Sequence, residues 1–178
     1  MGWSVASFRG RFAPRTEGRA FLALVARRVE AGFLMGRPHF RSRYAVASKS
    51  GDELAIRSED FWTDFNVGLN DVTLRLLRDG VVEYDVRFGR WLRGCLLLCG
   101  TIALILLFAY ALPLPAHLSF AAQMRHASSQ ERGLGNAIFW GSLIWWGLAW
   151  PWVLAALHRR PAEGLLRGIL GEVDAAGS

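Results

Sequence analysis

The chain has 178 residues, a formal net charge of +6 and 52% apolar residues, which allows one ordinary domain or one small domain with a membrane anchor. Residues 1–90 hold all but six of the 21 basic side chains and all but four of the 15 acidic ones, as expected of a membrane protein with an extramembrane domain. The basic excess comes with no recognisable nucleic-acid-binding module, so the composition argues against a nucleic-acid partner.

The first fifteen residues, MGWSVASFRGRFAPR, lack the apolar core of a signal peptide. We expect residues 1–15 to form a disordered, basic N-terminus. Residues 1–48 carry a net charge of +7 and residues 49–90 a net charge of −3, from nine basic against two acidic and six basic against nine acidic side chains. The basic region would suit either an anionic lipid surface or the acidic stretch that follows it.

Residues 16–90 predict a soluble α+β domain. Thr16 is placed to cap a helix running to about Met35, with an apolar arc made by Phe21, Leu22, Val25, Ala26, Val29 and Phe33. This helix either packs on its own sheet or lies on a membrane surface, and the sequence favours the sheet.

Two β-hairpins are expected after this helix. In the first, Arg43–Ser48 and Glu53–Ser58 flank a Ser-Gly turn; in the second, alternating apolar residues flank Asp79-Gly80, a strong hairpin signal. Between them, Ser58 is placed to cap a short helix through Phe61, Trp62 and Phe65. The prediction is one helix plus about four antiparallel strands.

Residues 91–158 predict an all-α, two-helix transmembrane hairpin. The first span is expected at about 93–113, an outer loop at about 114–135 and the second span at about 136–157. No charged side chain occurs from Gly94 to Pro115 or from Gly133 to Leu157. Pro151 removes one backbone donor from the second span and predicts a kink.

The charges around the spans predict the orientation. Basic residues precede the first span and follow the second: Arg75, Arg78, Arg87, Arg90 and Arg93, then Arg159, Arg160 and Arg167. The loop has only Arg125 and Arg132. By the positive-inside rule, both termini lie in the cytoplasm and the chain is a two-pass protein of the plasma (inner) membrane. Residues 159–178 are expected to form a short amphipathic cytoplasmic helix at the membrane surface.

For each candidate site, a role in packing is favoured over a role in catalysis or ligand binding. Cys95, Cys99 and Ala103 form a stripe of small residues that suits close helix packing better than a metal or redox site. Trp145 and Trp146 lie near the middle of the second span, where they stack on a partner helix or wall a lipid or ligand groove.

Two further sets of side chains are favoured as solvated. These are His117 and His126 with Glu131 in the outer loop, and Asp60, Asp64 and Asp71 near Glu59. Neither set has the spacing of a metal site. The sequence therefore predicts no catalytic, cofactor-binding or metal-binding residue and no cofactor.

The functional expectation is a non-catalytic scaffold or accessory subunit that recruits a partner through its cytoplasmic domain. The lipid bilayer is one partner, and a protein or a second copy of the chain is expected along the membrane helices. A subunit of an oligomeric pore or transport complex is the alternative, although the spans lack intramembrane charges. A lipid-handling enzyme using the acidic stretch 59–71 is a further alternative, and no small molecule is indicated.

Overall fold

The computed structural model describes residues 6–33, 43–67, 69–111 and 128–178. The chain divides into two compact units, one of residues 1–92 with 155–178 and one of residues 93–154. We call the first the sheet unit and the second the helix unit, and each is described separately.

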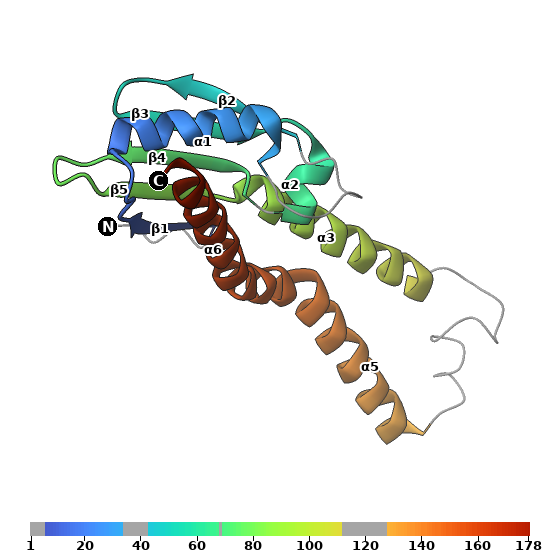
Figure 1. The fold of residues 1–178 in the computed structure, drawn as a ribbon. Coiled ribbons are helices and arrows are strands. Elements are labelled where there is room, and N and C mark those ends of the chain that lie inside the picture. The colour runs from blue at the N-terminus through green and yellow to red at the C-terminus, as the bar shows by residue number, and fades with distance from the viewer. Residues whose placement is uncertain (1–5, 34–42, 68, 112–127) are drawn as a thin grey trace. The chain divides into compact units, whose positions relative to one another are not determined.

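The sheet unit is built on one antiparallel sheet (Figure 1). Its five strands, in the spatial order β1-β5-β4-β3-β2, are β1 (Ser7–Phe12), β5 (Val82–Arg87), β4 (Asp71–Leu76), β3 (Glu53–Ser58) and β2 (Tyr44–Lys49). The two expected hairpins, β2–β3 and β4–β5, are confirmed. An N-terminal α+β region with an antiparallel sheet is likewise confirmed.

The prediction of about four strands and a disordered N-terminus is wrong at β1. Residues 7–12 pair with β5 along its whole length, from Ser7 opposite Arg87 to Phe12 opposite Val82. The physical reason is an alternation of apolar and basic side chains, in which Phe8 is buried while Arg9 is exposed. This period-two pattern places one face of β1 on the core and the other in solvent.

Helix α1 (Gly18–Gly32) packs on the sheet, as the sequence favoured. It buries Phe21, Leu22, Val25, Ala26 and Val29, and its nearest strands are β2, β3 and β4. The expected cap at Thr16 is wrong, because Glu17 occupies the N-cap position and no side chain caps the helix there. A short helix, α2 (Phe61–Val67), connects β3 to β4.

Helix α6 (Trp150–Gly177) corrects the prediction of a separate surface tail over 159–178. Pro161 lies inside this helix instead of starting a new one, although proline removes one backbone hydrogen bond there. From Ala155 onward α6 belongs to the sheet unit, where it buries Ala155, Ala162, Leu166, Ile169, Leu170 and Val173. An apolar stripe of this kind suits lipid as well as a protein core, so the local pattern does not reveal that it packs within the sheet unit.

The helix unit contains most of α3 (Gly89–Ala111), then α5 (Ser129–Ile144), the π-helix η1 (Trp145–Ala149) and the first turn of α6. The outer loop expected at 114–135 ends earlier than predicted, since Ser128 caps α5 through a reciprocal pair with Glu131. This Ser-x-x-Glu capping box is visible in the sequence. The remainder of the predicted loop lies outside the described residues.

The helices Gly89–Tyr110 and Ser129–Gly177 are long and apolar enough to cross a membrane, by length and composition. The helical run departs from α geometry just before Pro151, where the Trp150 amide donates to the carbonyl of Trp145, five residues earlier. Proline at 151 cannot donate to the carbonyl of Gly147, so an irregular turn was expected here.

The β4–β5 turn gives a first testable prediction. Gly80 has φ +79° and its amide donates to the Leu77 carbonyl at 3.1 Å, while the Asp79 carboxylate accepts from the Val81 amide. Because a side chain at positive φ is strained, Gly80→Val is expected to cost about 1 kcal/mol or more of folding stability. Thermal unfolding in detergent measures this.

The matched control is Gly51→Val in the β2–β3 turn. A side chain at Gly51 meets open space, and its backbone does not have a positive φ. Equal losses for the Gly51 and Gly80 variants would contradict the assignment of the strained turn.

Candidate functional site

A buried polar network occupies one end of the sheet unit. Ser58 ends β3, Asp64 lies on α2, Asn70 immediately precedes β4, and Arg90 and Trp91 form the first turn of α3. The Ser58 hydroxyl donates to the Asp64 carboxylate, and the Asn70 amide donates to the same carboxylate at 2.9 Å. The Asn70 side-chain oxygen accepts from the Trp91 amide at 2.9 Å.

Arg90 closes this network from the α3 side. Its guanidinium donates to the backbone carbonyls of Ser58 at 3.1 Å and Asn70 at 2.9 Å. It also pairs with the carboxylates of Asp64 and Asp71, each at 3.2 Å. Charge-assisted hydrogen bonds of this kind are about twice as strong as neutral ones, so α2, β4 and the start of α3 are joined in one block.

Of the acidic residues that the sequence placed on a solvated face, Asp64 is instead buried, and Asp60 and Asp71 have partners within the domain. Asp71 is shared between Arg57 and Arg90. Asp60 begins α2 by accepting from the Thr63 amide at 2.8 Å and from its hydroxyl at 2.9 Å, the role that the sequence had assigned to Ser58. The pKa of Asp60 is lowered, first by the hydrogen bond from the Thr63 backbone.

Tyr44 lies opposite Ser58 in the sheet, next to this network. Burial raises the pKa of its phenol far above the usual range, the negative charge of Asp64 raises it further, and Arg90 opposes both. The hydroxyl is buried and has no hydrogen-bond partner among the described residues. The phenol therefore stays neutral and contributes packing, with its ring 5.0 Å from that of Phe33.

A second cluster joins α6 to the middle of the sheet. The Tyr84 hydroxyl donates to Glu163 at 2.9 Å and accepts from Arg167 at 2.8 Å, while Arg167 and Glu163 pair at 3.1 Å. Tyr84 crosses over Gly10, where an added Cβ would lie 2.1 Å from the Tyr84 hydroxyl oxygen. Glycine at position 10 is what lets the tyrosine reach α6.

Asp174, near the end of α6, holds the chain ahead of α1. Its carboxylate accepts from the backbone amides of Arg15 at 3.0 Å and Thr16 at 3.1 Å. Burial alone would raise the pKa of Asp174, but these hydrogen bonds outweigh it and the pKa is lowered. The tail of the chain is thus bonded to residues 15–16 as well as packed on the core.

This contact predicts a pH dependence. A carboxyl whose pKa is lower in the folded state stabilises the fold above its unfolded pKa of about 3.9, and this contribution is lost as the pH falls through the folded value. Asp174→Asn is therefore expected to lower folding stability by about 1–2 kcal/mol at pH 7, with the difference vanishing in strong acid. Denaturant unfolding of both proteins between about pH 3 and pH 7 shows whether this difference in folding stability disappears as the pH falls. A constant difference at every pH would contradict it.

The outer face of the sheet, opposite α1, is covered with charged side chains. Ion pairs cross it between Arg9 and Asp85 at 2.9 Å, Arg75 and Glu53 at 2.9 Å, and Arg57 and Asp71 at 3.0 Å. The three arginine side chains are each more than 60% exposed. The shallow depression on this face has a volume of about 180 Å³ and is lined by Arg9, Glu53, Thr73, Arg75, Glu83, Asp85 and Arg87.

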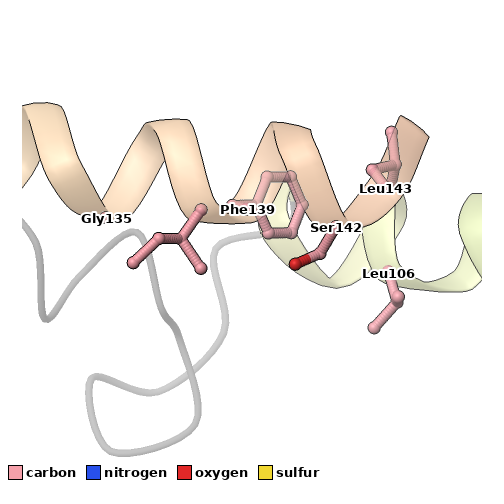
Figure 2. Close-up of a pocket in the computed structure, with 6 residues that line it drawn as sticks. Leu106, Gly135, Phe139, Ser142 and Leu143 are labelled. Atoms are coloured by element: carbon pink, nitrogen blue, oxygen red, sulfur yellow. The ribbon is translucent and has the colours of Figure 1, made fainter. Parts of the chain in front are cut away.

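The helix unit holds a pocket of about 350 Å³ between α3 and α5, lined by Leu106, Gly135, Ile138, Phe139, Ser142 and Leu143. Figure 2 shows Leu106 on α3 facing the α5 side chains. Among the described lining residues, Ser142 has the only polar side chain. Next to the pocket, Tyr110 stacks on Phe139 at 4.5 Å and its hydroxyl donates to Asn136 at 3.3 Å. Apart from the Ser142 hydroxyl, the described lining is apolar and has the character of a site for an apolar chain.

The small-residue stripe makes one close helix contact. A Cβ added at Gly147 would lie 3.0 Å from the Cβ of Ala103, whereas a Cβ added at Gly141 would meet open space. Cys95 is buried and Cys99 half-buried, and both are free thiols. No group of three or more metal-binding side chains occurs within the part of the chain that the structure describes. His117 and His126 lie outside it.

This contact carries a further prediction. Ala103→Leu is expected to overpack the approach to Gly147 and destabilise the helix pair by about 1–3 kcal/mol, whereas Cys99→Ala is expected to be tolerated. Thermal unfolding in detergent and cross-linking between α3 and α5 give the comparison. If Cys99→Ala did the greater damage, the thiol and not the packing would be what matters.

Trp145 and Trp146, whose stacking on a partner helix the sequence favoured, are each about half exposed. Both contact Trp150 of the same helical run, with ring centroids 6.3 and 4.9 Å apart. Stacking on another helix stays a prediction.

Polar networks at Arg90 and Tyr84 were not predicted from sequence, because their members come from distant elements. The sequence indicates these networks only through polar side chains, such as those of Ser58 and Tyr84, at strand positions where the alternation predicts an apolar residue. No protein-family model matches the chain, and comparisons with curated proteins and with solved structures found no match either.

Proposed function

We propose that the chain is a two-pass membrane protein whose sheet unit recruits or regulates a protein partner in the cytoplasm, without catalysing a reaction. The observation that carries the proposal is the exposed apolar surface of the helix unit. Leu97, Ile105 and Leu148 are 73%, 61% and 66% exposed, and they belong to a much larger set on α3, α5 and η1. Surfaces of this kind are stable in lipid and not in water.

The orientation follows from the flanking arginines. Arg90 and Arg93 begin α3, and Arg159 and Arg160 follow the second apolar segment. The positive-inside rule then puts the sheet unit in the cytoplasm, at the plasma (inner) membrane. Both ends of the hairpin lead into helical residues that belong to the sheet unit.

The outer face of the sheet is the surface that we assign to the partner. One face of the sheet is occupied by α1 and the later part of α6, and the opposite face presents the exposed ion pairs. Exposed pairs contribute only about 0–1 kcal/mol each to folding, so these charges can exchange partners at little cost. They give electrostatic specificity for a protein with a complementary pattern.

Charge reversal tests this assignment. Arg9→Glu with Arg75→Glu is expected to remove proteins that co-purify with the tagged full-length chain from native membranes, while thermal stability falls little. Arg27→Glu is the matched control, because Arg27 is exposed on α1, away from the outer face. The surface would be wrongly assigned if Arg27→Glu removed the same proteins or if the double variant retained them.

A further inference from the structure

The sheet unit has one exposed aromatic patch. Phe61 and Trp62, the first two residues of α2, are 62% and 70% exposed, and their rings contact each other at 5.7 Å in an edge-to-face arrangement. Among the described residues of 6–92, no other large apolar side chain is comparably exposed. A tryptophan this exposed on a small domain marks a contact surface.

Helix α2 is held firmly in place. Its first turn is capped by Asp60, and the Asp64 carboxylate is bonded to Ser58, Asn70 and Arg90. The carboxylates of Asp60, just before α2, and of Asp64, on α2, are therefore bonded within the domain. At the start of α2 the side chains of Phe61 and Trp62 are exposed, and so is that of Glu59.

The same bonds hold α2 to the first turn of α3, inside the sheet unit. Asp64 pairs with Arg90, and Asn70 holds the amide of Trp91. The uncharged segment of α3 begins at Gly94, three residues after Trp91. At a rise of about 1.5 Å per residue, Arg90 and Trp91 lie within about 6 Å of the start of this segment.

The polar layer on each side of a bilayer is roughly 5–8 Å thick. Arg90 and Trp91, which α2 and its neighbour Asn70 bind, are thus only a few residues in the chain from the point where the uncharged segment would enter the hydrocarbon. Tryptophan is enriched in the polar layer because its ring is apolar and its N–H is polar. Figure 1 shows α2 next to the start of α3, whose first turn belongs to the sheet unit.

We propose that Phe61 and Trp62 form a membrane-interface anchor, which inserts among lipid headgroups. The proposal rests on the proposed membrane insertion of α3 and names the lipid that a further part of the domain contacts. The two anchor side chains are uncharged, the carboxylates of Asp60 and Asp64 are bonded within the domain, and the exposed charge beside the anchor, Glu59, is negative. The anchor needs no anionic lipid.

Site-directed spin labelling of the full-length protein tests the anchor. Nitroxides are placed at Trp62→Cys, Ser50→Cys and Leu104→Cys in a Cys95→Ala, Cys99→Ala background, and each protein is reconstituted in phosphatidylcholine vesicles. Ser50 is an exposed control in the β2–β3 turn, and Leu104 is an exposed residue of α3. Accessibility to oxygen, which partitions into lipid, is compared with accessibility to a water-soluble nickel complex.

The expected oxygen-to-nickel ratio is high at position 104, intermediate at 62 and low at 50, and adding phosphatidylglycerol leaves the value at 62 unchanged. If the label at position 62 has the same low ratio as the label at position 50, while the label at position 104 still reports lipid, the anchor is overturned and the proposed function stays intact. A label at 104 that behaves as at 50 overturns membrane insertion itself. A label at 62 shielded from both reagents reports a protein contact, and this also overturns the lipid assignment.

Discussion

Arg90→Met is expected to destabilise the sheet unit by about 3 kcal/mol, because it leaves a buried carboxylate without its counter-charge. Arg90 is the partner of Asp64, whose side chain is only 13% exposed, and it also satisfies the carbonyls of Ser58 and Asn70. Methionine fills a similar volume but donates no hydrogen bond. Denaturant unfolding of the purified full-length protein in detergent measures the loss.

The matched control for this variant is Arg75→Met. Arg75 pairs with Glu53 at 2.9 Å, but its side chain is 62% exposed. An exposed pair contributes about 0–1 kcal/mol, so the control is expected to unfold almost as the parent does. Similar losses for the two variants would show that Arg90 does not hold the network together.

Leu170→Ala is expected to cost about 2–5 kcal/mol, the usual range for a large-to-small change in a packed core. Leu170 has 0% relative exposure and lies on the part of α6 that belongs to the sheet unit. Its neighbours along the stripe, Leu166 and Val173, are buried as well. Loss of this residue opens a cavity under α6 and loosens the end of the helix that Asp174 bonds to residues 15–16.

Leu165→Ala is the control on the same helix. Leu165 is 41% exposed and lies off the buried stripe, so its truncation is expected to change stability by much less than the Leu170 variant. An interfacial tail, as the sequence suggested, predicts the reverse: both variants keep the domain stable and weaken membrane association. Proteolysis of the tail in detergent adds a second readout, with faster cleavage expected only for Leu170→Ala.

The elements with strong local patterns were predictable. Asp79-Gly80 between alternating strands gave the β4–β5 hairpin, and the apolar arc from Phe21 to Val29 gave the buried face of α1. The uncharged segments gave the two long apolar helices. In each case the deciding interactions lie within one element or between neighbours in sequence, so pattern and turn chemistry are sufficient.

The features that depend on distant partners were not predictable. Strand β1 contains Gly10, which interrupts the apolar alternation of the strand. A glycine is needed there because the Tyr84 side chain lies across it. The apolar stripe of α6 has the same spacing whether it faces lipid or a protein core, and from the sequence alone it is assigned to the membrane surface. The acidic residue Asp64 reads as solvated until Arg90, 26 residues later, is found beside it. Local sequence carries no information on such pairings.

Cysteine accessibility in intact cells tests the central claim most directly, namely that two helices cross the membrane and leave the sheet unit inside. Single cysteines at Ser128 and Ser50, both exposed, are introduced into the Cys95→Ala, Cys99→Ala background and treated with a membrane-impermeant thiol reagent. The account predicts that Ser128→Cys reacts in intact cells and that Ser50→Cys reacts only after lysis. Reaction of Ser50→Cys in intact cells, or equal reaction at both positions, would contradict it.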